Sequence, residues 1–280
     1  MNTFNDLIEF LQWKMQEPTP YGWFHWLSIA VVAAITAFLC VRFRDCKEKT
    51  FRRILLIGWV LIVVLEIYKQ VVFVSVHGAP GSYYWEYHWG GFPYQFCSTP
   101  LYVLPFIIFC KPGKLRDACM AFMSTFVLLA GIAVYLFPET VLSVHIGHSI
   151  QTMVHHGLQL VFGIYIAVYN RRRFNVKWYL AALPVFGALV LVAVLLDSFV
   201  PMWIGSDYTF NMFFISWRYP GDIPFITVLH WGFEFLAKIP YPIFLFLYLL
   251  AFSLVAFAVF GALFGAFKLA EHLAEKKKKA

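Results

Sequence analysis

The sequence predicts an all-α membrane protein, a bundle of seven transmembrane helices with the N-terminus outside and the C-terminus inside. The first observation is composition: 61% of the 280 residues are hydrophobic and 13% are charged, and the mean hydropathy is +0.71. A soluble domain of this length cannot bury that much apolar surface, so lipid must be the solvent for most of the chain. The second is a series of apolar runs, each about 20 residues long and able to span a bilayer. The third is the placement of lysine and arginine.

The seven predicted spans lie near residues 22–43, 51–76, 92–110, 116–137, 149–170, 177–199 and 240–267. The third span contains Pro93, Pro100 and Pro105. Proline removes a backbone donor and clashes with the preceding turn, so we expect this helix to be broken. Freed backbone groups survive in a membrane only where protein or a water-filled cavity satisfies them. The connection 200–239 is rich in aromatic and turn residues, and we expect a structured outer loop there.

Lysine and arginine gather in alternate connections. The first, third and fifth connections are basic, and the chain ends in Lys276 to Lys279, whereas the second and fourth connections contain neither residue type. Basic loops are retained in the cytoplasm, which predicts the stated orientation. The same clusters account for the net charge of +7, so we expect no nucleic-acid partner.

The domain organisation follows from these runs. Residues 1–20 are predicted to form an interfacial amphipathic segment, residues 21–268 the seven-helix membrane domain, and residues 269–280 a basic cytoplasmic tail. In the first segment the apolar face of a helix would carry Phe4, Leu7, Ile8, Leu11 and Met15.

Polar residues inside the spans are the candidates for a functional site. Glu66 and Lys69 are three residues apart in the second span and can pair on one helix face. This pair is either a structural ion pair or part of a polar site, because charges inside a membrane are costly. The fifth span carries a polar stripe at intervals of three and four residues, formed by His145, His148 or Ser149, Thr152, His155 or His156, and Gln159.

Cys97 lies at the outer end of the third span, at the depth of this histidine stripe. A nearby histidine that acts as a base would make the thiol nucleophilic. We therefore expect Cys97 and the histidines to face a common cavity in the outer half of the protein. The other cysteines lie toward the cytoplasmic side and are interpreted as packing residues.

The outer loop supplies further polar candidates. Asn211 could orient a histidine, donate to an oxyanion or cap a short helix. The others are Asp207, Tyr208, Arg218, Asp222, His230 and Glu234.

Four motifs occur in the order and spacing of one known family. They are FPYQFC at 92–97, TMVHHG at 152–157, FNMFF at 210–214 with Pro220 after it, and IPYPIF at 239–244. Together they resemble the YwaF-like bacterial integral membrane proteins, which are similar to the transmembrane protein 164 family. The resemblance implies a lipid acyltransferase with a cysteine nucleophile and a histidine, and the bacterial plasma membrane as location.

Carried over residue by residue, the resemblance places the nucleophile at Cys97, the histidine before glycine at His156, and the asparagine at Asn211. The family pattern reads Asn-Tyr-Met, whereas this chain has Asn-Met-Phe at 211–213. His155 stands beside His156, so the choice of base stays open between them.

Three functions follow from these residues. The first is a phospholipid acyltransferase or lipase-like hydrolase, whose partners are membrane phospholipids or lysolipids and which needs no cofactor. The second is a transporter or ligand-binding protein with a site at Glu66 and Lys69. The third is a metal-dependent hydrolase that uses the histidine stripe; it ranks lower because there is no HExxH motif and no acidic residue among the histidines.

Overall fold

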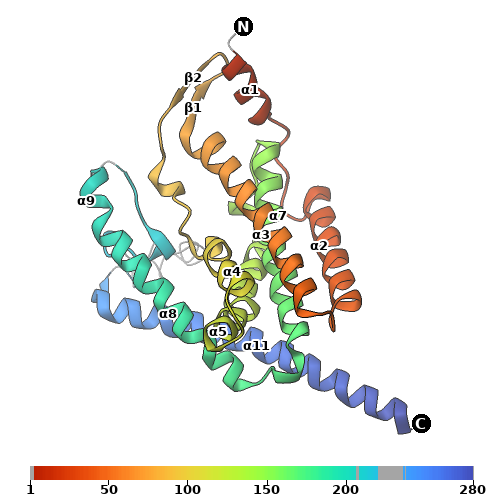
Figure 1. The fold of residues 1–280 in the computed structure, drawn as a ribbon. Helices are drawn as coiled ribbons and strands as arrows, with labels where there is room; N and C mark the ends of the chain where they lie inside the picture. The colour runs from red at the N-terminus through yellow and green to blue at the C-terminus, as the bar shows by residue number, and fades with distance from the viewer. Residues whose placement is uncertain (1–2, 206–207, 220–235, 237, 280) are drawn as a thin grey trace.

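The computed structural model describes residues 3–205, 208–219, 236 and 238–279, and they form a bundle of helices (Figure 1). Among these residues, six helical segments are long and apolar enough to cross a membrane: Trp23–Arg42, Glu48–Ser75, Lys114–Leu136, Ile146–Tyr169, Val176–Ile204 and Tyr241–Lys277. At the position of the predicted third span lies a shorter apolar segment, Phe96–Phe109. The prediction of an all-α membrane bundle is confirmed, with the third segment too short to be counted with the other six.

The first half of the chain contains α1 (Thr3–Leu11), α2 (Trp23–Arg42), α3 (Glu48–Lys69), the π-helical turn η1 (Gln70–Ser75), strands β1 (Val76–Ala79) and β2 (Ser82–Trp85), the 3₁₀ turns η2 (Trp89–Gly91) and η3 (Phe96–Ser98), α4 (Pro100–Phe109), α5 (Lys114–Phe122), the π-helical turn η4 (Met123–Val127) and α6 (Leu128–Leu136). The second half contains the 3₁₀ turn η5 (Pro138–Thr140), α7 (Ile146–Tyr169), the 3₁₀ turn η6 (Arg171–Arg173), α8 (Val176–Phe199), α9 (Pro201–Ile204), the 3₁₀ turn η7 (Met212–Phe214) and α11 (Tyr241–Lys279).

Helix α7 is central to the bundle. It contacts α2, α3 and α6, and most of its length is buried, as is the α5–η4–α6 segment. Glycines allow the close approach: a Cβ on Gly163 would lie 2.7 Å from Leu128 Cβ, and a Cβ on Gly131 would lie 3.1 Å from the carbonyl oxygen of His156. Small residues are the usual means by which membrane helices bring their backbones together.

The third predicted span is broken as its prolines require. Pro93 precedes the helix, Pro100 occupies its first turn, where no backbone donor is needed, and Pro105 lies inside α4. Pro105 cannot donate to the carbonyl of Leu101, and the indole Nε1 of Trp59 donates to that oxygen instead, at 3.0 Å. A side chain of α3 thus satisfies the backbone group that the proline frees.

A two-stranded hairpin, which the sequence analysis did not predict, follows α3. Strands β1 and β2 pair antiparallel, with Val76 opposite Trp85, and Gly81 adopts a positive φ of 81° in the turn. The hairpin lies beside α1 at one end of the molecule (Figure 1), and Asn5 Nδ2 donates to the carbonyl of Gly81. Helix α1 ends at Leu11, so Met15 does not share its apolar face; its N–H instead donates to the carbonyl of Val144.

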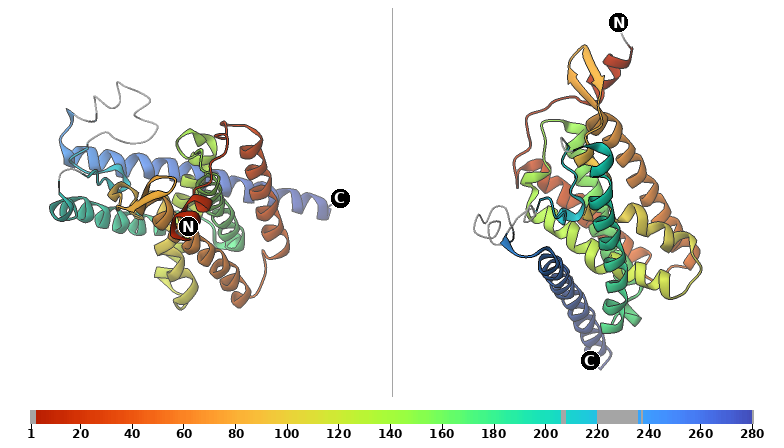
Figure 2. Two further views of the ribbon diagram at one scale, coloured as in Figure 1. Left: turned by 90° about the horizontal axis from the view of Figure 1, so that it is seen from above. Right: turned by 90° about the vertical axis from the view of Figure 1, so that its left-hand side faces the viewer.

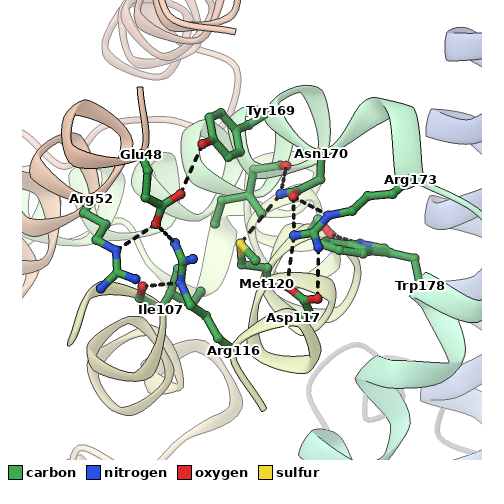
Figure 3. Close-up of polar contacts among 12 residues, drawn as sticks. Glu48, Arg52, Ile107, Arg116, Asp117, Met120, Tyr169, Asn170, Arg173 and Trp178 are labelled. Atoms are coloured by element: carbon green, nitrogen blue, oxygen red, sulfur yellow. Dashed lines mark hydrogen bonds and ion pairs between the residues drawn. The ribbon is translucent and has the colours of Figure 1, made fainter. Parts of the chain in front are cut away.

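Ion pairs join the first, third and fifth connections at the opposite end of the bundle. Figure 3 shows Glu48 between Arg52 and Arg116, with Glu48 Oε1 2.5 Å from Arg116 Nη2. In the same view Arg173 makes a bidentate pair with Asp117, at 2.9 Å for both bonds. The alternating basic connections therefore meet at one end, as expected, while their side of the membrane stays a prediction.

A further ion pair joins the first and fifth connections. Arg171 Nη2 donates to Asp45 Oδ1 at 2.7 Å. This hydrogen bond holds the pKa of the Asp45 carboxyl below its ordinary value. Because Asp45 is exposed to solvent, this pair contributes little to the free energy of unfolding.

The segment predicted as a basic tail is helical over residues 269–279. Helix α11 continues to Lys279, and its last turns project beyond the other helices (Figure 2). The connection between α9 and α11 is described for residues 208–219, which lie against α8, where Asp197 Oδ1 accepts from the N–H of Met212. Asp207, Asp222, His230 and Glu234 lie outside the described residues.

Candidate functional site

A cavity of about 410 Å³ lies where the broken third segment meets α6, α7 and α11. Cys97 and His156 both line it, and the remaining lining is almost entirely apolar, including Ala130, Ala133 and Phe252. The structure therefore brings the predicted cysteine and one of the two predicted histidines to a single apolar space.

The backbone of Cys97 is held by two side chains of α7. His155 Nε2 lies 2.9 Å from the carbonyl oxygen of Cys97, and Gln159 Nε2 donates to the same oxygen at 2.7 Å. The two residues are four apart, hence on one helix face. A carbonyl oxygen can only accept, so His155 carries its proton on Nε2. The 3₁₀ turn that presents Cys97 is thereby fixed to α7.

His156 is oriented differently. Its Nδ1 lies 2.8 Å from the carbonyl oxygen of Thr152, which again can only accept, so the proton of the neutral ring is on Nδ1. Nε2 therefore carries the free lone pair, and no hydrogen bond to it occurs among the described residues. Neighbouring positions on a helix point about 100° apart, which is why His155 contacts the turn while His156 lines the cavity.

No hydrogen bond joins Cys97 Sγ to either imidazole among the contacts of the described residues. Cys97 and His156 thus share a cavity, and His155 contacts the backbone carbonyl of Cys97. Thr152 and Gln159, predicted as members of the polar stripe, join the site through their bonds to His156 and to Cys97.

The other predicted polar residues lie in separate groups. Glu66 is buried and pairs with Lys69 at 2.7 Å, and it also accepts from Gln70 at 2.8 Å. Gln70 in turn donates to the carbonyl of Gly91, so this group ties α3 to the segment before Cys97. His148 stacks on Phe73, with ring centroids 4.9 Å apart.

Asn211 contacts neither histidine. Its Oδ1 accepts from the N–H of Ser216 at 2.9 Å, beyond the turn Met212–Phe214, and its carbonyl accepts from Gln95 Nε2 at 2.9 Å. Asn211 precedes the turn Met212–Phe214 but makes no side-chain hydrogen bond that caps it.

Metal binding has no preformed cluster in the described part of the chain. No group of three or more His, Cys, Asp or Glu side chains there is placed to hold an ion.

Comparison with known proteins identifies the family. The model of the TMEM164 family matches residues 20–264, which is most of the chain. The chain belongs to the TMEM164 family. No curated protein and no solved structure matches it.

For this TMEM164-family chain, the match confirms the relation that the four sequence motifs indicated, and the matched range includes Cys97, His156 and Asn211. Sequence reasoning missed Gln95, Phe214 and Trp59, which also shape the site. Gln95 lies inside the motif FPYQFC, two positions before the cysteine, and that proximity was the available signal.

Proposed function

We propose that this chain is a membrane-embedded lipid acyltransferase, or a lipase-like acyl hydrolase, in which Cys97 is the nucleophile and His156 the base. The observation that carries the proposal is that both side chains line one apolar cavity. An apolar cavity suits an acyl chain, and a cysteine–histidine pair suits acyl transfer. Membrane phospholipids are then the acyl donors, and lysolipids or other alcohols the acceptors.

The tautomer of His156 supports its assignment as the base. With the proton on Nδ1 and that nitrogen bonded to Thr152, Nε2 is the atom free to take the thiol proton. Cys97 Sγ then attacks the ester carbonyl and forms a thioester, while Nε2 returns the proton to the departing alkoxide of the lysolipid. An acceptor alcohol, or water in a hydrolase, reverses these steps and regenerates the thiol.

The oxyanion formed during attack needs a hydrogen-bond donor. The N–H of Cys97 lies beside the thiol of its own residue, and the carbonyl of the same residue is fixed by His155 and Gln159. A backbone N–H next to the nucleophile is a common oxyanion donor, because it is already placed beside the reacting carbon. We assign this role to the N–H of Cys97, with His155 and Gln159 as positioning residues.

The transporter alternative rests on the Glu66–Lys69 pair. Lys69 neutralises the charge of Glu66, and Gln70 Nε2 donates a hydrogen bond to the same carboxylate. The two charged groups are thus paired within the protein and need no bound solute. The acyltransferase reading is therefore favoured. The location proposed for the reaction is the outer half of a bacterial plasma membrane, with the N-terminus outside and the C-terminus in the cytoplasm.

The decisive experiment is the mass of the intact purified protein after incubation with phospholipid. We expect an acyl adduct on the wild-type chain, located at Cys97 by peptide mass, and no adduct on Cys97→Ala. The substitution removes one sulfur from a cavity wall, so the fold should persist, as thermal unfolding in detergent can verify. Full acyl transfer by a folded Cys97→Ala variant would eliminate the covalent mechanism.

A further inference from the structure

The turn Met212–Phe214, far from Cys97 in the sequence, forms part of the wall of the Cys97 cavity. Phe214 lines the cavity together with Cys97. Phe213 packs on Tyr94 and Phe96, with ring centroids 5.6 Å from each. The turn thus lies directly on the segment that leads to the cysteine.

The backbone of this turn is strained. Phe213 and Phe214 have φ values of 54° and 59°. Bulky residues rarely adopt this left-handed region, because Cβ approaches the carbonyl oxygen. Two consecutive residues in such a conformation persist only where surrounding contacts hold them.

Gln95 supplies those contacts from the cysteine side. Its Oε1 accepts from the N–H of Phe213 at 3.0 Å, and its Nε2 donates to the carbonyl of Asn211 at 2.9 Å. The Gln95 side chain therefore bonds the backbone of the residue before Met212 and of the residue after it. On the other side, Asp197 accepts from the N–H of Met212 at 2.7 Å.

We infer that Gln95 and the strained turn together set which acyl chains the Cys97 cavity accepts. Phe214 is the specificity-determining wall. Gln95 also lines the cavity, and its two hydrogen bonds to the turn make it the positioning residue for that wall. This inference rests on the proposed function for its substrate class, because an apolar cavity beside a nucleophilic thiol takes an acyl chain. The physical cause is that the wall depends on a backbone conformation which Phe214 would not adopt unaided.

The test measures alkylation of Cys97 by N-alkyl maleimides of increasing chain length in detergent micelles, followed by the mass of the Cys97 peptide. Alkylation needs no catalysis, so it reports the cavity even if acyl transfer fails. Phe214→Ala removes the wall, and the rate ratio of the longest to the shortest reagent should rise by about tenfold. Partition of the reagents into micelles is common to all variants and cancels.

Gln95→Ala should raise the same ratio, and the double variant Gln95→Ala/Phe214→Ala should raise it by less than the two separate effects combined, because the turn held by Gln95 is the one that carries Phe214. Gln12→Ala is the matched control: Gln12 also bonds backbone carbonyls, those of Val72 and Val76, but at the hairpin end. It should leave the ratio unchanged.

Additive effects of the two substitutions, or an unchanged ratio in folded Gln95→Ala, would overturn the role of Gln95. If Gln95→Ala does not fold, Phe214→Ala still tests the inference. An unchanged ratio of alkylation rates in Phe214→Ala would show that Phe214 does not limit the chain length that the cavity accepts. A shifted alkylation profile without any acyl adduct from phospholipid would refute the proposed enzyme and leave the cavity wall standing.

Discussion

Two adjacent histidines in α7 serve the site in different ways. His155 donates to the backbone of the cysteine turn, whereas His156 donates to its own helix and lines the cavity. Both assignments follow from the fact that a carbonyl oxygen accepts and never donates. His156 is therefore the side chain better placed to take a proton, because its hydrogen bond through Nδ1 leaves Nε2 unprotonated.

Substitution of the two histidines should separate these roles. His156→Ala should lower the rate of acyl transfer by about 10²–10⁴-fold, the usual contribution of a general base. His155→Ala should cost less, because Gln159 still donates to the carbonyl of Cys97. Adduct formation at several times after mixing measures both rates. A dominant loss in His155→Ala, with His156→Ala near wild type, would keep the covalent mechanism and reverse the assignment of the base.

The buried ion pair in α3 allows a second residue-level prediction. Glu66→Ala leaves the ammonium of Lys69 without its carboxylate and should lower the free energy of unfolding by about 1–3 kcal/mol. The double variant Glu66→Ala/Lys69→Ala should be less destabilised than Glu66→Ala, since no unpaired charge remains. Thermal unfolding in detergent compares the variants. Equal loss in the single and double variants would mean that the pair contributes little.

Among the helices, close packing depends on positions that lack a side chain. The approach of α7 to the α5–η4–α6 segment requires Gly163, because a Cβ there would meet Leu128 and the carbonyl of Met123. The wide turn η4 lies in the same region, where Ser124 and Thr125 both donate to the carbonyl of Ala121. Side chains that take a helical acceptor in this way distort the helix locally.

A pair of glycine substitutions tests this packing. Gly163→Ala should destabilise the bundle by about 1–3 kcal/mol through overpacking. Gly187→Ala, in α8, is the matched control, because no atom lies within 4 Å of the position of its Cβ. There alanine should be neutral or stabilising by about 0.5–1 kcal/mol through helix propensity. The shift of the unfolding midpoint in detergent measures both. Equal shifts would contradict the proposed contact.

The molecule as a whole has two chemically different ends. One end carries the ion pairs of Asp45, Glu48 and Asp117 with arginines. Figure 3 shows those of Glu48 and Asp117, and Figure 1 shows α1 and the hairpin at the other end. The 28-residue segment Glu48–Ser75 joins the two ends, a length of about 40 Å at the helical rise. That length suffices to cross the hydrocarbon core and the headgroup region.

This polarity predicts the topology in the membrane. Single cysteines placed at the exposed positions Lys47 and Ser82 should differ in intact cells: the Ser82→Cys variant should react with a membrane-impermeant thiol reagent, and Lys47→Cys should react only after lysis. The unsubstituted chain gives the background from its own cysteines. The reverse pattern would invert the orientation, and equal labelling of both sites from outside would show that the segment between them does not span.

The membrane class, the approximate spans and the break in the third helix follow from local sequence. Partition into lipid depends on the summed apolar character of a run, and a proline breaks a helix wherever it lies, so neither property requires knowledge of distant contacts. The Glu66–Lys69 pair is equally local, being three residues apart on one helix. Cys97 and the histidine stripe could be named as candidates because polar residues within an apolar run are visible in the local sequence.

Three features required tertiary structure: the choice between His155 and His156, the bond from Trp59 to Leu101, and the docking of Gln95 on the turn at Phe213. Each depends on how helices are rotated about their axes and on which distant segments pack together. A rotation of about 100° would exchange the two histidines without altering the hydropathy or the length of α7. Gln95 and Phe213 are 118 residues apart. Their hydrogen bond arises because folding places two irregular segments side by side, and a pattern of neighbouring residues contains no information about that placement.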